Sequence, residues 1–332
     1  MASGFMICLK DAIYVARSDR AFRGRDIRKK ELPALTSFKS VLANLLGALP
    51  RDIAMITDGV NKNFRVVADD LDLFARFSPS SLHTKRELDG EVELLNSLNV
   101  VGAPCCKPVS VKGQFVTGPF HIEGVEYHVL LNQTIIGDVL SPQLVDAREF
   151  GRSLAAVHQT RVEKRNASEA PRSSTVREPE NISSVFQELK QLLAAQEDRN
   201  GDSLIGICHG DAWLGNAKWS GGRAILFDFE YARVGPVVYD IASFIWSLQE
   251  LQDNDLQVAV YKSFVQGYRS VYDVSFDEGG LKANVLRREI NNIEFLSTYI
   301  AMSGEVAVAA AELAEATCSL VTSARFSSFA WK

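Results

Sequence analysis

The sequence lacks the patterns that mark several classes of protein. It contains no apolar run near the ~18 residues that a membrane-spanning helix needs, and Lys10 and Asp11 interrupt the N-terminal segment before a signal-type apolar core forms. Its five cysteines are odd in number and include no Cys-x-x-Cys pair, which argues against a disulfide framework and against a zinc site. We therefore expect a reduced, cytoplasmic protein.

A strong overall excess of one charge is also missing, but the charge is unevenly distributed. The net charge is −5, whereas residues 1–30 hold eight Lys or Arg against three Asp. Such a basic arm could bind nucleic acid or acidic lipid, but the interspersed acids favour a solvated extension. We expect neither nucleic acid nor membrane as a partner, and the acidic remainder favours a cationic small molecule. The oligomeric state stays open.

What is present is an ordinary globular composition in a chain of 332 residues, which is long enough for two domains. In the first half, strand-like runs bounded by turn residues alternate with two stretches of helical periodicity. The pattern predicts an antiparallel sheet with a helix packed on it. The predicted elements are a helix at 35–46, strands at 52–57, 63–68 and 71–77, a helix at 82–98 and a strand at 128–136.

In the second half, helical periodicity dominates. The predicted elements are a helix at 141–157, an exposed polar loop at 161–184, a helix at 185–196, a strand at 204–208, a hairpin at 217–227 and helices beyond 240. The sum is an α+β fold, with a small antiparallel-sheet lobe followed by a larger, mostly helical lobe.

One stretch carries a pattern typical of chemistry. The segment ICHGDAWLGNAKW places Asp211 at the end of a strand and Asn216 five residues later. A hairpin turned at 220–222 is expected to bring Asp228 back close to Asn216. A carboxylate that can take a proton, together with an Asn and a second carboxylate that share a divalent cation, is what phosphoryl transfer from a nucleotide requires.

The segment HGDAWLGN, followed by DFE twelve residues after Asn216, resembles the catalytic loop and metal-binding segment of aminoglycoside phosphotransferases and choline kinases, which are relatives of protein kinases. The resemblance extends over about residues 53–250. It implies a protein-kinase-like two-lobed fold. The implied parts are a basic N-terminal extension at 1–34, a nucleotide-binding lobe with a hinge at 35–135 and a helical catalytic and acceptor-binding lobe at 136–332.

The same resemblance implies nucleotide-binding residues in the first lobe. The segment DGVNKNFRV around Asn61 is similar to a loop that lays backbone N–H groups over phosphates. Arg76 stands where many kinases have Lys, and Glu91 matches the acid that pairs with that residue. The main chain near Gln133 and Ile135 matches the hinge that would hydrogen-bond adenine.

In the second lobe, the resemblance implies that Asp211 orients the acceptor hydroxyl and accepts its proton. Asn216 and Asp228 would hold one or two Mg²⁺ ions. His209 is interpreted as a structural brace of the catalytic loop. Asp240 is interpreted in the same way, with metal ligation as the alternative.

Two further residues are candidates for binding the acceptor. Glu230 stands beside the metal-binding segment, where it could attract an amine. Trp246 could face a cationic substrate through its ring, and the alternative is that it belongs to the core.

These residues favour a kinase that uses ATP and Mg²⁺ to phosphorylate a hydroxyl of a small molecule, such as an aminoglycoside or a choline-like amino alcohol. Two alternatives stay open. A nucleotide-binding pseudokinase that acts as an interaction module is permitted by Arg76. An atypical bacterial protein Ser/Thr kinase is disfavoured by the missing Ala-Pro-Glu signature of an activation loop. The sequence leaves open the acceptor, the hydroxyl and the choice between ATP and GTP.

Overall fold

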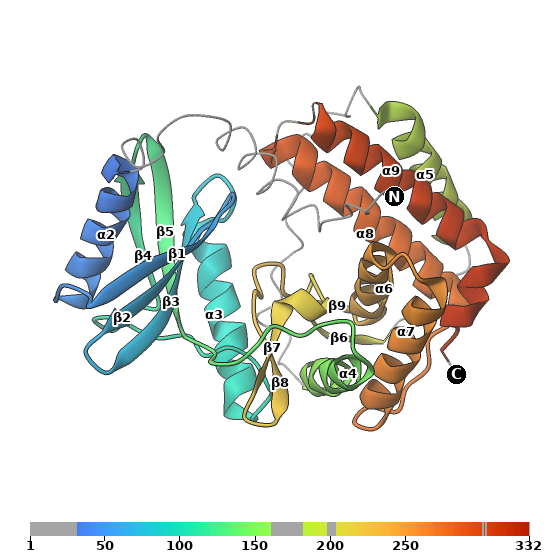
Figure 1. The fold of residues 1–332 in the computed structure, drawn as a ribbon, viewed down its shortest axis with the longest axis horizontal. Coiled ribbons are helices and arrows are strands. Elements are labelled where there is room, and N and C mark those ends of the chain that lie inside the picture. The colour runs from blue at the N-terminus through green and yellow to red at the C-terminus, as the bar shows by residue number, and fades with distance from the viewer. Residues whose placement is uncertain (1–31, 161–181, 198–203, 301, 303, 332) are drawn as a thin grey trace. The chain divides into compact units, whose positions relative to one another are not determined.

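The computed structural model describes residues 32–160, 182–197, 204–300, 302 and 304–331 (Figure 1). The chain divides into two compact units: the first contains the residues up to 96 together with 106–135, and the second contains 97–105 and the residues from 136 onward. Nearly all of the basic extension and most of the polar loop at 161–184 lie outside the described residues.

The first unit is built on a five-stranded antiparallel sheet in the order β1-β2-β3-β5-β4. Its elements are α2 (Leu32–Leu46), β1 (Asp52–Asp58), β2 (Lys62–Ala68), β3 (Leu71–Pro79), α3 (Lys85–Val100), β4 (Val116–Ile122) and β5 (Val125–Gln133). The predicted elements of this region are present, but β4 was not predicted. Gly118 and Pro119 interrupt its pattern, and the sheet accommodates them because β4 is an edge strand with a register shift there.

The two faces of this sheet carry different cores. On one face, Phe38 of α2 packs against Phe64, Phe77 and Tyr127, with ring centroids 5.3, 4.9 and 5.5 Å away. On the other face, Leu88 of α3 belongs to a smaller buried cluster. Because side chains alternate along a strand, Arg76 points away from the Phe77 face and towards the face that α3 covers (Figure 1).

The second unit consists mainly of helices around two small two-stranded sheets, β6–β9 and β7–β8. Its elements are α4 (Leu144–Gln159), α5 (Ser183–Glu197), β6 (Ile205–Cys208), β7 (Ala217–Ser220), β8 (Arg223–Leu226), β9 (Arg233–Pro236), α6 (Val238–Ser247), α7 (Asn254–Arg269), α8 (Glu278–Tyr299) and α9 (Glu305–Thr322). The short strand β9 was not predicted. The combination of an antiparallel sheet with helices confirms the predicted α+β class.

Helix α6 forms the centre of the second unit, because nine of its ten residues are buried. Its Phe244 stacks against Phe264 of α7 at 4.2 Å and against Phe150 of α4 at 5.5 Å. Helix α8 packs against α5, α6 and α9. Among the described helices, none combines the length and apolar character needed to cross a bilayer. Residues that α6 and α8 carry are therefore held in fixed positions by a dense core.

Candidate active site

The candidate catalytic loop begins where β6 ends. Strand β6 is paired with β9 and delivers His209, Gly210 and Asp211 in succession. Gly210 has φ of +86°, and a Cβ atom at this position would lie 2.2 Å from the carbonyl oxygen of Tyr231. Only glycine fits this combination of left-handed backbone and close approach. The Gly of the His-Gly-Asp motif is therefore a geometric requirement of the turn that presents Asp211.

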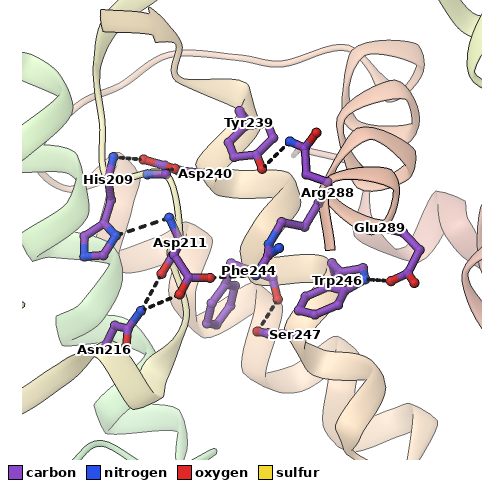
Figure 2. A network of polar contacts seen from close by, with 12 residues as sticks. His209, Asp211, Asn216, Tyr239, Asp240, Phe244, Trp246, Ser247, Arg288 and Glu289 are labelled. Carbon is purple, nitrogen blue, oxygen red and sulfur yellow. Dashed lines mark hydrogen bonds and ion pairs between the residues drawn. The ribbon is translucent and has the colours of Figure 1, made fainter. Parts of the chain in front are cut away.

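The main chain of this loop is held by Asp240, which is fully buried (Figure 2). Its carboxylate accepts hydrogen bonds from the amide nitrogens of His209 at 2.5 Å and Gly210 at 2.9 Å. His158 Nε2 lies 2.9 Å from the same carboxylate, and His158 Nδ1 lies 2.7 Å from the hydroxyl of Tyr268. With both oxygens bonded to the protein, Asp240 has the geometry of a brace.

The electrostatics of Asp240 depend on its partners. Burial by itself would raise the pKa of this carboxyl, but the hydrogen bond and charge interaction with His158, the nearby His209 and the amide of Gly210 together bring the pKa below its ordinary value. Asp240 is therefore ionised beneath the loop, and its negative charge is compensated by donors that the protein supplies.

His209 is fully buried, and its ring makes contacts of the kind expected of a structural residue. Its Nε2 donates to the carbonyl oxygen of Phe227 at 2.9 Å, and its Nδ1 accepts from the amide of Asp211 at 3.3 Å. The ring also lies 4.4 Å from that of Phe229. Both ring nitrogens bond to main chain, which ties the catalytic loop to the segment that follows β8.

Asn216 bonds directly to Asp211, as Figure 2 shows. Its Nδ2 donates to the carbonyl oxygen of Asp211 at 2.9 Å and to the carboxylate Oδ2 at 3.0 Å. The amide of Asn216 is thus oriented with its nitrogen towards Asp211, and its oxygen is the atom that could ligate a hard cation.

The hairpin between β7 and β8 returns the chain to Asn216 as predicted. Gly221 and Gly222, with φ of 59° and 79°, supply the two left-handed residues of a tight hairpin turn. The amide of Phe227 then donates to the carbonyl oxygen of Asn216 at 2.9 Å. The next residue, Asp228, has φ of +66°, a conformation that costs a non-glycine residue about 1 kcal/mol and that often marks functional sites.

Asn216 and Asp228 suit a magnesium ion better than a metal that is coordinated by protein side chains alone. Within the described ranges, no three His, Cys, Asp or Glu side chains gather around one point. Mg²⁺ normally takes one or two protein oxygens and completes its octahedron with water and phosphate oxygens. The amide oxygen of Asn216 and the half-buried carboxylate of Asp228 are donors of this kind, and half-buried Glu230 follows two residues later.

Sequence reasoning missed a residue that contacts Asp211. Arg288 of α8 donates from Nη2 to Asp211 Oδ1 at 2.6 Å, and its guanidinium lies 4.4 Å from the ring centroid of Trp246. Because 77 residues separate Arg288 from Asp211, no local pattern connects them. The adjacent basic residues Arg287 and Arg288, in a part of the chain with an excess of acids, were an available signal.

The position of Trp246 corrects its suggested contact with a substrate cation. The side chain is 8% exposed, Arg288 covers the ring, and Nε1 donates to Glu289 Oε2 at 2.6 Å (Figure 2). A cation of the chain itself therefore takes the place proposed for a substrate, and Trp246 belongs to the core. Burial raises the pKa of Glu289 to about 8, so this carboxyl is protonated at neutral pH.

In the first unit, Arg76 and Glu91 form a buried ion pair between β3 and α3. Asn61 lies in the turn between β1 and β2, where Lys62 Nζ bonds to Asp58 at 2.7 Å and to the carbonyl oxygen of Gly59 at 2.8 Å. The ion pair with Glu91 fixes the side chain of Arg76. The two contacts of Lys62 fix the shape of the turn.

The end of β5 limits how the suggested hinge could contact adenine. The amide of Gln133 donates to the carbonyl oxygen of Lys107 at 2.8 Å, and the amide of Thr134 donates to that of Asp72 at 2.9 Å. A nucleotide contact by Gln133 would therefore have to use another of its atoms. Ile135 is half-buried and follows the end of β5 by two residues, and its contact with adenine stays a prediction.

Comparison with known proteins identifies the class. The model of the phosphotransferase enzyme family matches residues 52–275, about two thirds of the chain. The chain belongs to this family, as its resemblance to aminoglycoside phosphotransferases and choline kinases predicted. A homoserine kinase from Neisseria meningitidis serogroup B is 36% identical over 86 residues, which cover 25% of this chain and only 28% of that protein.

Solved structures of small-molecule kinases share the fold. A microcompartment-associated aminopropanol kinase is similar with a TM-score of 0.70 and 18% identity, covering 86% of this chain and 96% of that one. An amicoumacin kinase in complex with AMP-PNP and Ca²⁺ is similar with a TM-score of 0.67 and 16% identity, covering 85% of this chain and 92% of that one. These likenesses confirm the predicted kinase-like fold.

Replacing Gly210 with Ala is expected to damage the loop more than the same change at Gly222. Both glycines have a positive φ, but a Cβ atom at Gly222 would meet nothing within 4 Å. Gly222→Ala should cost about 1 kcal/mol of unfolding free energy, from backbone strain alone. Gly210→Ala should cost about 3 kcal/mol or more, because the Cβ atom adds a clash with main chain. Urea denaturation of both variants measures this, and equal losses would contradict it.

Replacing Glu289 with Gln is expected to change how stability depends on pH. The folded protein holds the Glu289 proton up to about pH 8, whereas the unfolded chain releases it near 4.5. Stability from this group is thus complete below pH 4.5 and is lost as pH rises towards 8. The isosteric Gln does not titrate. Between pH 5 and pH 8.5, the unfolding free energy of the variant should therefore rise relative to that of the unmodified protein, by up to a few kcal/mol.

The control for this comparison is Glu278→Gln on the same helix, because the hydrogen bond with Lys282 lowers the pKa of Glu278. The measurement is the unfolding free energy of the unmodified protein, Glu289→Gln and Glu278→Gln, each at pH 5 and at pH 8.5. A difference between unmodified protein and Glu289→Gln that stays constant with pH would show that Glu289 is ionised throughout.

Proposed function

We propose that this protein is an ATP- and Mg²⁺-dependent kinase that transfers a phosphoryl group to a hydroxyl of a small molecule. The observation that carries the proposal is the Asp211 carboxylate, held by Asn216 at the end of β6 in a chain of the phosphotransferase family. Asp211 would accept a hydrogen bond from the acceptor hydroxyl, orient its oxygen for attack on phosphorus and receive its proton.

Phosphoryl transfer needs positioning and charge neutralisation more than covalent help from the protein. Mg²⁺, when bound, would neutralise the negative charge of the phosphates. Asn216 and Asp228 are the residues that would hold it. Arg76 would contact nucleotide phosphates from a guanidinium that Glu91 fixes, and the turn at Asn61 would offer main-chain N–H groups. With these assignments, residues 35–135 would bind the nucleotide and residues 136–332 would bind the acceptor.

For the acceptor, we propose a small alcohol that carries an amine. Residues 224–332 contain fourteen Asp or Glu against eight Lys or Arg, an excess that attracts cations. Two similar proteins are named for homoserine and aminopropanol, which each carry a hydroxyl and an amine. Half-buried Glu230, two residues after Asp228, is the candidate partner of that amine.

The roles of Asp211 and Asp228 are separable by isosteric replacement. Asp211→Asn should lower kcat by ~10²-fold or more and leave the affinity for Mg²⁺–nucleotide nearly unchanged, because only the proton acceptor is lost.

Asp228→Asn should remove most of the increase in nucleotide affinity that Mg²⁺ provides. Nucleotide titrations with and without Mg²⁺, beside steady-state kinetics, measure both effects. ATP binding without turnover of any acceptor would instead support a pseudokinase.

The charge of the acceptor can be tested with matched pairs of alcohols that differ only in an amine replaced by a methyl group. At low salt the amine-bearing member should show the higher kcat/KM, by about tenfold, because an ion pair in a partly shielded site contributes about 1 kcal/mol or slightly more. Glu230→Gln should raise the KM of the acceptor more than the KM of ATP. Equal kcat/KM within each pair would leave neutral alcohols or sugars as the acceptors.

A further inference from the structure

Arg288 contacts Asp211 from a helix that lies far from it in the sequence. The two side chains are 14% and 5% exposed, so their ion pair is largely shielded from water. We infer that Arg288 is a positioning residue for phosphoryl transfer, which fixes the orientation of the Asp211 carboxylate towards the acceptor hydroxyl. The inference rests on the catalytic role proposed for Asp211.

The carboxylate of Asp211 is held through both of its oxygens. Arg288 donates to Oδ1 at 2.6 Å, and Asn216 donates to Oδ2 at 3.0 Å (Figure 2). Two bonds to different oxygens define the plane of the carboxylate and oppose rotation about the Cβ–Cγ bond. A carboxylate has about four acceptor positions, so these two bonds are compatible with a further one from an acceptor hydroxyl.

Arg288 is itself held by a platform on α6 and α8. Its guanidinium stacks 4.4 Å from the centroid of Trp246, whose Nε1 is fixed by the fully buried Glu289. Trp246 belongs to the buried helix α6, so the platform has the rigidity of the core. A planar guanidinium can stack on the ring and donate to the carboxylate at once, whereas a Lys ammonium supplies only the charge.

The ion pair between Arg288 and Asp211 also reduces the negative charge at the place where the phosphate would react. An isolated carboxylate at Asp211 would repel the phosphates of the nucleotide, and the guanidinium offsets that negative charge. Arg288 thus acts through Asp211 in two ways, by orienting the carboxylate and by compensating its charge. Both effects belong to the chemical step, so they should appear in kcat.

The chain offers a matched control for this residue. Lys282, on the same helix, also pairs with a carboxylate, Glu278 at 2.8 Å, and also lies over an aromatic ring, Phe326 at 5.3 Å. Lys282→Met therefore removes a cation together with an ion pair and a ring contact, the same kinds of contact that Arg288→Met removes, but it leaves Asp211 untouched. Thermal unfolding and circular dichroism of each variant establish that it is folded.

Arg288→Met should lower kcat by ~10²-fold, the loss typical of a small misplacement of a reacting group, with the KM of ATP changed by less than about threefold. Arg288→Lys should have a kcat about tenfold higher than that of Arg288→Met, because Lys keeps the positive charge but lacks the planar guanidinium. Lys282→Met should stay within about twofold of the unmodified protein. If Arg288→Met does not fold, Arg288→Lys decides, and an unchanged kcat in that variant overturns the inference.

The decisive measurement combines Arg288→Met with Asp211→Asn. If Arg288 acts only through Asp211, the double variant should be no slower than Asp211→Asn alone. A further tenfold loss would show that Arg288 acts independently and would overturn the inference, as would an unchanged kcat in Arg288→Met. In both cases the unmodified protein still turns over, whereas absence of turnover in the unmodified protein would overturn the proposed function itself.

Discussion

The candidate active site depends on one buried carboxylate, that of Asp240. The left-handed turn at Gly210 directs the amide groups of His209 and Gly210 into the protein interior, where an unpaired amide costs about 1–3 kcal/mol. Asp240 accepts hydrogen bonds from both amides, and His158 supplies a third donor to its carboxylate. The turn that presents Asp211 is therefore stable only while α6, which carries Asp240, is packed beneath it.

This dependence connects the loop to the core. His158 comes from α4 and its other partner, Tyr268, from α7, so hydrogen bonds through His158 link three helices in series to the carboxylate of Asp240. The same α6 carries Trp246, on which Arg288 stacks before it reaches Asp211. Both the main chain and the side chain of the candidate catalytic Asp are thus fixed by the packing of α6.

The sequence predicted what local patterns determine. The strand that delivers Asp211, the hairpin turned at 220–222 and the return of the chain to Asn216 all follow from one continuous stretch, residues 204–228. Strand β4 was missed because Gly118 and Pro119 break the alternation that marks a strand. Arg288 was missed for a different reason, since its contact with Asp211 exists only after α8 has packed against α6. Periodicity gives the buried face of a helix but not which distant residue it will meet.

The ion pair between Arg288 and Asp211 also constrains how an amine-bearing acceptor could be recognised. Because the guanidinium already compensates the Asp211 carboxylate, this residue has little remaining attraction for a second cation. Trp246 offers no alternative, since Arg288 covers its ring. If the acceptor carries an amine, as proposed, selectivity for it would come from acidic groups other than Asp211, such as Glu230. The protein would then separate the two tasks, with a charge-compensated Asp for the hydroxyl and a different acid for the amine, so that substrate preference could change without disturbing the catalytic loop.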